Sequence, residues 1–433
     1  MIDKEEINKL SKKYGSPFFL INEAKIKGNI DRFRKSFSNY KGKFTLGYST
    51  KTNPQVGILK VMKKYSVTSE CASYLDLASS HSAGYKGEEM VYAGLHKPIS
   101  SLEYAIDKNI DIINIESIHE AKNLKQILES KNKTIKVGVR IGFSAKSGIK
   151  SILGVTYDRF GASTENGEAR EIIDYLIKNK KYFELVGLHC HPGSNIKNPK
   201  KYFFAIDELE KLSNYIFKKY KIKIKLFNIG GGIGIKEVYF YSPINLIVNS
   251  FFRIFKKRPS YNLEAFDQKK MLDKIVEYLN KKFSKHDSYP EVMMEPGRAL
   301  IGNAIDLNTK VVNIKKTESG NWLIVDAGTN LLSILTLFTE FHKFKTYNNS
   351  NIFKKYSIAG PLLYSSDVIV SNICLPTQNI GDTIKICDVG AYFNSQSSHF
   401  LFARCATLIK TIDSEYNLVE RKEEFEDIVK RSY

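Results

Sequence analysis

The sequence of 433 residues has few cysteines, a single tryptophan and no long apolar run. None of its apolar runs reaches the roughly 18 residues that a membrane-spanning helix needs. Five cysteines, an odd number without close pairs, argue against a disulfide scaffold and against a cysteine-rich zinc site. The amino terminus, MIDKEEINKLSKKYG, lacks the apolar stretch of a secretory signal. We therefore expect a globular cytoplasmic protein.

The chain is strongly basic, with 66 Lys and Arg against 46 Asp and Glu and a formal net charge of +20. Such a charge is typical of proteins that bind nucleic acid or anionic membranes. The lysines, however, are dispersed along the whole chain, and no basic stripe or nucleic-acid module is recognisable. Composition also excludes wholesale disorder, because 42% of the residues are hydrophobic. We therefore expect no nucleic-acid partner.

Eight short apolar runs, rich in β-branched or aromatic residues, recur in the first three hundred residues. Stretches with helical spacing, such as SSLEYAIDK and SIHEAKNLKQILES, lie between most of them. Strands that alternate with helices predict a parallel sheet, and eight of them fit a closed (β/α)8 barrel. An open doubly wound sheet is the alternative. The runs are FTLGYST (44–50), VTSEC (67–71), MVYAG (90–94), DIINIES (111–117), IKVGVRI (135–141), ELVGLHCH (184–191), IKLFNIGGG (224–232) and EVMMEPG (291–297).

After about residue 300 the pattern changes to strand-like runs separated by turn residues, which predicts a carboxy-terminal all-β domain. We therefore place a barrel at 31–300 and the β domain at 301–433. An insertion at 235–259, IKEVYFYSPINLIVNSFFRIFKKRP, separates the seventh and eighth strands. Its aromatic residues at helical spacing favour core or dimer packing. Docking of a large acidic partner on its basic end is the alternative.

The ends of the predicted strands carry more polar groups than a folding scaffold requires. In a barrel, functional groups collect at the carboxyl ends of the strands, so we expect one site there. The contents of this site indicate a phosphorylated cofactor. In chain order, the strand ends carry Lys51, Glu70 with Ser73, His96, Glu116, Arg140, His191 with Ser194, the triplet Gly230, Gly231 and Gly232, and Glu295 with Arg298.

The glycine triplet 230–232 ends the seventh strand in FNIGGGIGI. Glycines let the backbone approach an anion and direct several N–H groups at it. A lone glycine run would more often be a plain tight turn. In barrels, however, phosphate sites typically lie after strands seven and eight. The position of the triplet, beside EPGR on the eighth strand, therefore favours a phosphate site.

Four side chains at these strand ends suit the chemistry of a pyridine cofactor. The amine of Lys51 could form an imine, although most lysines are solvated surface charges. The carboxylate of Glu295 could keep a pyridine nitrogen protonated, and a salt bridge to Arg298 is the alternative. His191 could stack on a ring or act as a base, and Ser194 could donate to a phosphate. In isolation, both residues would more often be structural.

Taken together, these motifs resemble the fold-type III decarboxylases that use pyridoxal phosphate, the diaminopimelate and ornithine decarboxylase family. The alanine racemases share the barrel, but their motifs fit this chain less well. The resemblance runs from about residue 15 to 430. It rests on GYSTKTNP, SECASYLDLA, GLHCHPGSN, FNIGGGIGI, MMEPGRALIGNAI and DVGAYFNSQSSHF, and the final VERKEEFEDIV is similar to the closing helix of the diaminopimelate branch.

The resemblance implies the cofactor pyridoxal 5'-phosphate, bound as a Schiff base to Lys51. It also implies an alanine-racemase-like barrel, a β domain completed by the amino-terminal segment 1–30, and a head-to-tail homodimer with shared active sites. The other implied groups are Glu295 on the pyridine nitrogen, His191 against the ring, Glu70 with Ser73 and Asp76 near the imine, and Ser194, Gly230, Gly231, Gly232, Arg298 and Tyr392 around the phosphate, with Arg298 serving phosphate or substrate.

The pattern breaks on the substrate side. After Gly-Pro-Leu the family usually carries a cysteine, the expected proton donor from the partner subunit, and a glutamate that helps recognise the substrate. This chain has Leu363 and Tyr364 there. Diaminopimelate enzymes also place an arginine and a tyrosine where this chain has Ile334 and Phe338. We therefore predict a pyridoxal-phosphate-dependent decarboxylase of an amino acid or amino-acid derivative other than diaminopimelate.

Several alternatives remain open at this point. Tyr364 is the nearest candidate for the missing acid, with Ser365 and His399 as weaker ones, and a packing role for Tyr364 is equally compatible with the sequence. The substrate could be an aminoacyl group tethered to an acidic carrier protein, which the basic insertion would suit. The chain could also be a racemase or epimerase on the same cofactor, or a non-catalytic regulatory relative.

Overall fold

A computed structural model describes residues 3–142, 159–237, 239–240, 266–337, 340–348, 350–430 and 432. Most of the insertion predicted at 235–259 lies outside these residues, and so does Phe338. The chain divides into two compact units. One unit comprises Asn29–Gly234 and Asp267–Ala299, and the other comprises Met1–Gly28, Ile235–Phe266 and Leu300–Tyr433. None of the described helices combines the length and apolarity that crossing a membrane requires.

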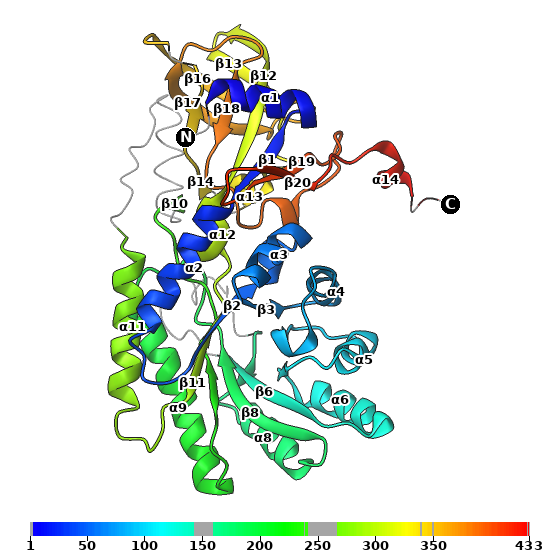
Figure 1. Ribbon diagram of the computed structural model, residues 1–433, viewed down its shortest axis with the longest axis vertical. Coiled ribbons are helices and arrows are strands. Elements are labelled where there is room, and N and C mark those ends of the chain that lie inside the picture. Colours follow the sequence, from blue (N-terminus) through cyan, green and yellow to red (C-terminus); the bar gives the residue numbers. More distant parts are fainter. Residues whose placement is uncertain are drawn as a thin grey trace. The chain divides into compact units, whose positions relative to one another are not determined.

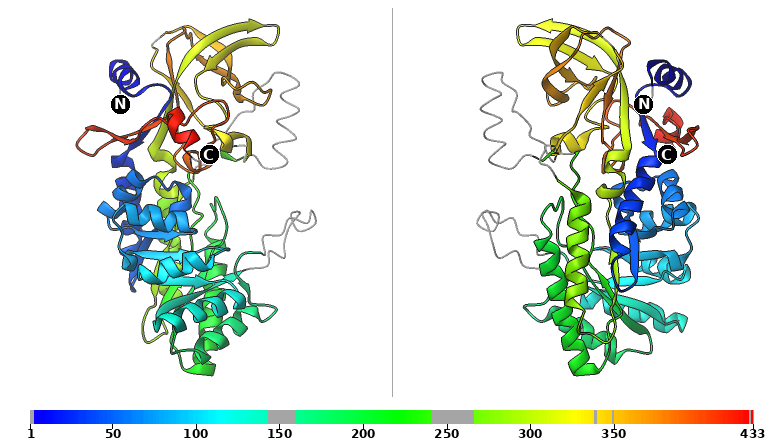
Figure 2. Two further views of the ribbon diagram at one scale, coloured as in Figure 1. Left: turned by 90° about the vertical axis from the view of Figure 1, so that its right-hand side faces the viewer. Right: turned by 60° about the vertical axis from the view of Figure 1, so that its left-hand side comes forward.

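The first unit is built around a closed parallel barrel (Figures 1 and 2). Its strands pair in the order β2–β3–β4–β5–β6–β8–β9–β11, and β11 closes the ring by pairing with β2. This confirms the predicted (β/α)8 barrel, since each of the eight predicted runs overlaps one strand. The strands are β2 (Phe44–Ser49), β3 (Thr68–Cys71), β4 (Met90–Ala93), β5 (Ile112–Ile115), β6 (Ile135–Gly142), β8 (Phe183–Cys190), β9 (Leu226–Asn228) and β11 (Glu291–Met294).

Helices follow most of the barrel strands, and several of them begin at a side-chain cap. The side chains of Ser73, Ser117 and Asp267 each accept a backbone N–H in the first turn of the helix that they precede. After β3 and β5 the capping serine follows the strand within two residues, so a short loop leads from the carboxyl end of each strand into the next helix. The helices of this unit are α3 (Val56–Lys64), α4 (Tyr74–Ser82), α5 (Ile99–Asp107), α6 (Ile118–Lys131), α8 (Glu168–Lys178), α9 (Lys200–Tyr220) and α11 (Gln268–Lys282), while α2 (Glu23–Phe37) crosses the boundary between the units.

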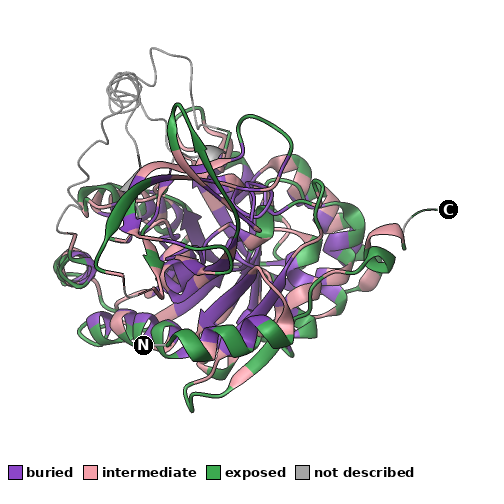
Figure 3. Cartoon of the chain, turned by 90° about the horizontal axis from the view of Figure 1, so that it is seen from above, coloured by how far each residue is buried: buried purple, intermediate pink, exposed green. Residues whose placement is uncertain are grey.

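The barrel strands form the core of this unit, as the buried residues at the centre of Figure 3 show. Every residue of β4 and β5 is buried. Strands buried on both faces read as continuous apolar runs, which is why the sequence pattern identified them. The short β7 (Ala162–Ser163), which extends the sheet beside β6, has no comparable run and was not predicted.

The second unit contains the predicted all-β domain. Its amino-terminal strand β1 (Phe18–Asn22) lies between β12 (Ile305–Thr317) and β19 (Ala406–Lys410). Helix α1 (Lys4–Tyr14) buries Ile7 and Leu10 against residues of β1 and β19. The domain boundaries themselves stay predictions. The other strands are β10 (Tyr239–Phe240), β13 (Gly320–Val325), β14 (Glu340–Phe341), β15 (Phe344–Thr346), β16 (Phe353–Ala359), β17 (Val368–Pro376), β18 (Thr383–Ile386) and β20 (Tyr416–Glu420), and the short helices are α12 (Arg298–Ile301), α13 (Ser333–Leu337) and α14 (Phe425–Val429).

Candidate active site

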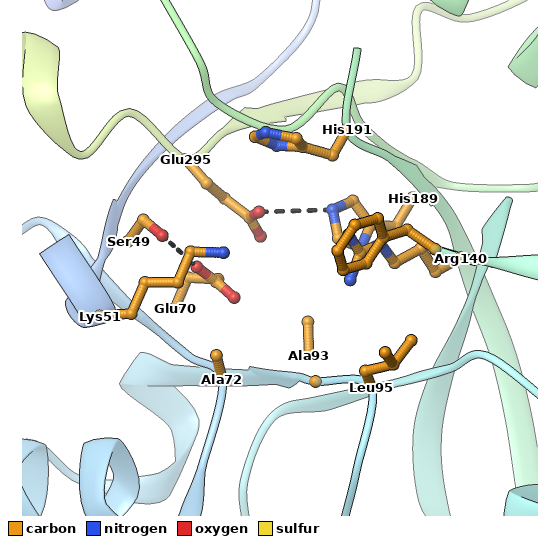
Figure 4. A pocket seen from close by; sticks show the side chains of 12 residues that line it. Ser49, Lys51, Glu70, Ala72, Ala93, Leu95, Arg140, His189, His191 and Glu295 are labelled. Carbon is orange, nitrogen blue, oxygen red and sulfur yellow. Dashed lines mark hydrogen bonds and ion pairs between the residues drawn. The ribbon is translucent and has the colours of Figure 1, made fainter. Parts of the chain in front are cut away.

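A cavity of about 170 Å³ opens among residues that end or follow the barrel strands. Five of the residues predicted from the sequence line it together, namely Lys51, Glu70, Arg140, His191 and Glu295 (Figure 4). The strand-end residue His96 is exposed and is not among the lining residues. The full lining is Ser49, Lys51, Glu70, Ala72, Ala93, Gly94, Leu95, Arg140, Phe160, His189, His191 and Glu295.

Lys51 stands on the short 3₁₀ helix η1 (Thr50–Thr52), directly after β2. The backbone N–H of Asn53 closes this turn on Thr50 O at 3.1 Å, and the hydroxyl of Tyr48 donates to Asn53 O at 3.0 Å. The turn is therefore held to the barrel on both sides of the lysine. In Figure 4 the amine of Lys51 points toward the carboxyl groups of Glu70 and Glu295.

Glu70 is a buried carboxyl group at the end of β3, only 4% exposed. The hydroxyl of Ser49 donates to its Oε2 at 2.8 Å. Burial, together with the nearby carboxylate of Glu295, raises the pKa of Glu70 to about 7, although the charge of Lys51 opposes the shift. Near neutral pH this group can therefore either hold or accept a proton beside the lysine amine.

Glu295 follows β11 and is also only 4% exposed. The amide of Asn228 donates to its Oε1 at 2.5 Å, and Nε2 of His189 lies 3.4 Å from its Oε2. Burial raises the pKa of Glu295, while the Asn228 hydrogen bond and the charges of Arg140 and Lys51 act in the opposite direction. The carboxyl group is thus fixed in the cavity wall at a position that can receive a positively charged N–H.

The two histidines of GLHCHPG lie in the same cavity. His191 follows β8, and its Nδ1 accepts the backbone N–H of Gly231 at 3.4 Å. In Figure 4 its ring stands on the opposite side of the cavity from Ala72 and Ala93. Desolvation, with the charges of Lys51 and Arg140 close by, lowers the pKa of His191, which keeps its imidazole neutral.

The sequence reasoning missed His189, which is 2% exposed and has no hydrogen-bond partner among the described residues. Burial, together with the charge of Arg140, lowers its pKa to about 3, so the ring is neutral. The signal was present, because side chains alternate along a strand and residues two apart face the same side. A lining role for His191 therefore implied one for His189.

Arg140 enters the cavity already paired. Its guanidinium donates to Glu116 Oε1 at 2.6 Å, and Glu116 Oε2 accepts the backbone N–H of Gly161 at 3.1 Å. The guanidinium carbon also lies 5.6 Å from the centre of the Phe160 ring. This wall, opposite Lys51 in Figure 4, combines an aromatic surface with a compensated charge.

The glycine triplet presses against neighbouring backbone. A Cβ added at Gly231 would lie 2.1 Å from Glu295 O, and one at Gly232 would lie 1.8 Å from Gly193 O. Gly230 and Gly232 also have positive φ angles, of 66° and 86°. The loops after β8 and β9 can therefore meet only with glycine at these positions, and the exposed Ser194 follows directly after Gly193 in this cradle.

The remaining predicted groups are not among the residues that line the cavity. Ser73 caps α4 by accepting the N–H of Asp76, whose carboxylate accepts the N–H of Ala72 at 2.9 Å, so the pair supports the cavity wall from behind. Arg298 begins α12, one residue before the end of the unit that contains the barrel, which we call the barrel unit. Tyr364 and Tyr392 belong to the other unit, which contains the β domain and which we call the β unit, and their roles stay predictions.

Comparisons with known proteins agree with this geometry. The pattern of the family described as "Pyridoxal-dependent decarboxylase, pyridoxal binding domain" matches residues 23–302. The chain is 27% identical to diaminopimelate decarboxylase of Methanocaldococcus jannaschii, over 99% of this chain and 93% of that protein. It is 26% identical to the Aquifex aeolicus enzyme of the same name, over 100% and 95%. A crystal structure of the M. jannaschii protein superposes with a TM-score of 0.85 at 25% identity, covering 98% of this chain and 94% of that one.

The residues around the cavity also fit pyridoxal phosphate on their own chemistry. A primary amine, a buried carboxyl group and a flat imidazole line one cavity, and the buried nitrogens of His189 have unmade hydrogen bonds. The glycine triplet packs so closely on neighbouring backbone that any Cβ there would collide with a carbonyl oxygen, and a glycine-rich turn of this kind can direct backbone N–H groups at an anion. The cofactor inferred from the resemblance is thereby confirmed by the family and consistent with the site.

The raised pKa of Glu70 predicts how the stability of the cofactor-free protein depends on pH. A protonated Glu70 is favoured by folding, so its contribution is fully present below about pH 4.5 and is lost as the pH rises through about 7. Replacing Glu70 by Gln removes this dependence. The variant should therefore gain, relative to wild type, on the order of 3 kcal/mol between pH 5 and 8, measured by urea unfolding.

The matched control is Glu103→Gln, at an exposed glutamate on α5, which should not reproduce the gain of Glu70→Gln between pH 5 and 8. Parallel curves for wild type and Glu70→Gln would show that Glu70 titrates normally.

Proposed function

This chain belongs to the pyridoxal-dependent decarboxylase family, and we propose that it decarboxylates an amino acid other than diaminopimelate in the cavity described above. The supporting observation is the grouping of Lys51, His191 and Glu295 around one cavity at the ends of the barrel strands. When bound there, pyridoxal phosphate supplies an electron sink for the electron pair left by the departing carboxyl group.

The barrel residues bind and orient the cofactor in this proposal. Lys51 Nζ would hold the cofactor, and Glu70, whose pKa of about 7 suits proton exchange near neutral pH, would take and return the proton of Lys51 Nζ. Glu295, held by Asn228, keeps a proton on the pyridine nitrogen. His191 covers one face of the ring and excludes water from it.

The phosphate is assigned to the glycine cradle and its neighbours. The N–H of Gly230 donates to Asn228 Oδ1 and that of Gly231 to His191 Nδ1, so we assign the backbone N–H of Gly232 and the hydroxyl of Ser194 as donors to the phosphate. Arg298 and Tyr392 complete the set, as the family resemblance implies. The resemblance also carries the prediction of a homodimer with shared active sites.

The β unit supports the substrate part of the proposal. At the position where diaminopimelate enzymes have an arginine, Ile334 is buried and apolar and offers no partner to a distal carboxylate. Loss of such a partner costs roughly 2–5 kcal/mol, a factor of tens to thousands in affinity. A substrate without a distal carboxylate would not incur this cost.

Tyr364 is our candidate for the proton donor. Its neighbour Leu363, which replaces the family's cysteine, is 89% exposed and has no proton to give. In the proposed step the Oη–H bond of Tyr364 breaks, the proton forms the new C–H bond at the α-carbon, and the electron pair stays on the phenolate oxygen until water restores the proton.

Attachment of the cofactor is tested first. Wild-type protein reconstituted with pyridoxal phosphate should be yellow, and borohydride should fix the cofactor on the peptide that contains Lys51, as seen by mass spectrometry. Lys51→Ala should lose both the colour and the mass increment while keeping its fold by circular dichroism. Lys60→Ala, at an exposed lysine of α3, is the control and should behave as wild type. Labelling at another lysine would reject the assignment.

The substrate is tested with a panel that contains meso-diaminopimelate, L- and D-lysine, L-ornithine, L-arginine and aminoacyl groups loaded on an acidic carrier protein. We expect carbon dioxide release with kcat/KM for diaminopimelate at least tens-fold below that of the best substrate. Diaminopimelate as the best substrate would overturn the substrate assignment. Racemisation of the panel without carbon dioxide release would replace decarboxylation by the racemase alternative.

The proton donor is tested by Tyr364→Phe, which removes only the hydroxyl group. If Tyr364 is the acid, kcat on the best panel substrate should fall about 100- to 10,000-fold, the usual contribution of a general acid. Binding of pyridoxal phosphate should not change. Wild-type turnover in this variant would exclude Tyr364 as the proton donor and leave Ser365 and His399 as the candidates.

A further inference from the structure

The phenol of Tyr364 is tied into a hydrogen-bond network that ends on a buried carboxylate in the same unit. Its hydroxyl contacts Thr329 Oγ1 in a short hydrogen bond, and Thr329 Oγ1 donates to Asp367 Oδ1 at 3.0 Å. Tyr364 is 43% exposed, whereas Thr329 and Asp367 are 4% and 3% exposed. An exposed phenol is thus connected through one hydroxyl group to an interior anion.

Asp367 is held from several directions. Its Oδ1 also accepts the backbone N–H of Thr329 at 2.7 Å, and its Oδ2 accepts the N–H of Leu362 at 2.8 Å. The backbone of Asp367 also accepts the N–H of Gly360 at 3.1 Å and donates to Tyr364 O at 3.2 Å. Charge-assisted bonds of this kind are roughly twice as strong as neutral ones, so this carboxylate has a fixed position.

The loops that carry these residues approach so closely that glycine is required. A Cβ added at Gly360 would lie 2.4 Å from Asp367 Oδ2 and 2.4 Å from Gly328 Cα. One added at Gly328 would lie 2.7 Å from the Leu362 side chain. The loop of Gly360–Asp367 therefore packs closely against the loop of Gly328–Thr329. This packing brings Thr329 into contact with Tyr364.

The chemistry of the three groups fixes the direction of the hydrogen bonds. A carboxylate only accepts, so Thr329 must give its single proton to Asp367. The oxygen of Thr329 then presents a lone pair to Tyr364, and the phenol donates to it. If Tyr364 loses its proton, the hydroxyl of Thr329 can turn and donate to the phenolate instead. One hydroxyl group can thus hold the phenol before proton transfer and stabilise its oxygen afterwards.

We infer that Thr329 is a positioning residue for Tyr364 and that Asp367 fixes Thr329 in the orientation that this role requires. The inference rests on the proposed function of Tyr364 as proton donor. The ring of Phe400 adds a second restraint, because it meets the Tyr364 ring edge-on with 5.5 Å between ring centres. Tyr364 is thereby oriented by its hydroxyl at one end and by its ring face at the other.

The orientation is tested without turnover by nitration of the resting enzyme with tetranitromethane, followed by peptide mass spectrometry. A phenol whose proton is held by Thr329 reacts slowly, so Thr329→Val should increase the nitration rate of Tyr364 several-fold. Thr329→Ser, which keeps the hydroxyl group, should restore the slow rate. Asp367→Asn should also increase it, because a neutral amide holds Thr329 less strongly. Tyr74, which is 46% exposed on the barrel unit, is the internal reference and should not change.

A matched control removes a similar bond elsewhere. Thr309 is fully buried, and its hydroxyl donates to Asp326 at 2.6 Å, so Thr309→Val deletes a buried Thr–Asp hydrogen bond without removing the hydroxyl that contacts Tyr364. It should leave the nitration of Tyr364 at the wild-type rate. Equal nitration of Tyr364 in wild type and Thr329→Val would overturn the inference, whatever the activity of either protein.

Turnover separates this inference from the proposed function. With the best substrate of the panel, Thr329→Val should lower kcat about 10- to 100-fold and leave KM within about threefold, the loss expected for one hydrogen bond to a charged group. In the Tyr364→Phe background the same change should cost nothing further. Faster nitration in Thr329→Val together with full activity of Tyr364→Phe would uphold the positioning and reject Tyr364 as the acid.

Discussion

The pairing of β11 with β2 is the constraint on which the site depends. This contact closes the barrel and places the first strand beside the last, so that Lys51 and Glu295 face one cavity although they lie at opposite ends of the barrel sequence. Parallel pairing all the way round then brings every carboxyl strand end to the same edge. An open sheet would separate these two groups, because its edge strands do not meet.

Closure of the barrel also places two buried ionisable groups in one cavity, and their protonation states can differ. Burial raises the pKa of both carboxyl groups, Glu70 and Glu295, and the charge of Glu295 raises the pKa of Glu70 further, but the surroundings of the two groups differ. Glu295 receives an amide donor from the neighbouring strand, while Glu70 receives a hydroxyl donor and faces the lysine. Two carboxyl groups with different partners can hold different protonation states at one pH. One then suits a fixed charge and the other suits proton exchange.

Sequence patterns predicted the barrel because buried parallel strands are continuous apolar runs, and they predicted the cavity because its chemistry follows directly after those runs. Residues whose hydrogen-bond partners depend on the pairing of strands or the packing of loops were not predicted. Asn228 lies within a strand, and its role appears only once β9 lies beside β11. Similarly, nothing in the sequence connects Thr329 with Asp367, since two glycines must first bring their loops together. His96 shows the converse error, because it follows a strand but does not line the cavity.

The departures from the family pattern fall on a different part of the chain from most of the cofactor residues. Apart from Tyr392, the predicted cofactor groups belong to the barrel unit, where the Cβ clearances around the triplet 230–232 leave no room for change. Leu363 and Tyr364 instead occupy the exposed turn of a loop whose backbone is anchored by Asp367. An anchored loop tolerates new side chains at its tip, because its conformation is set from beneath. Substitution there can alter the substrate or the proton donor while the cofactor site is preserved.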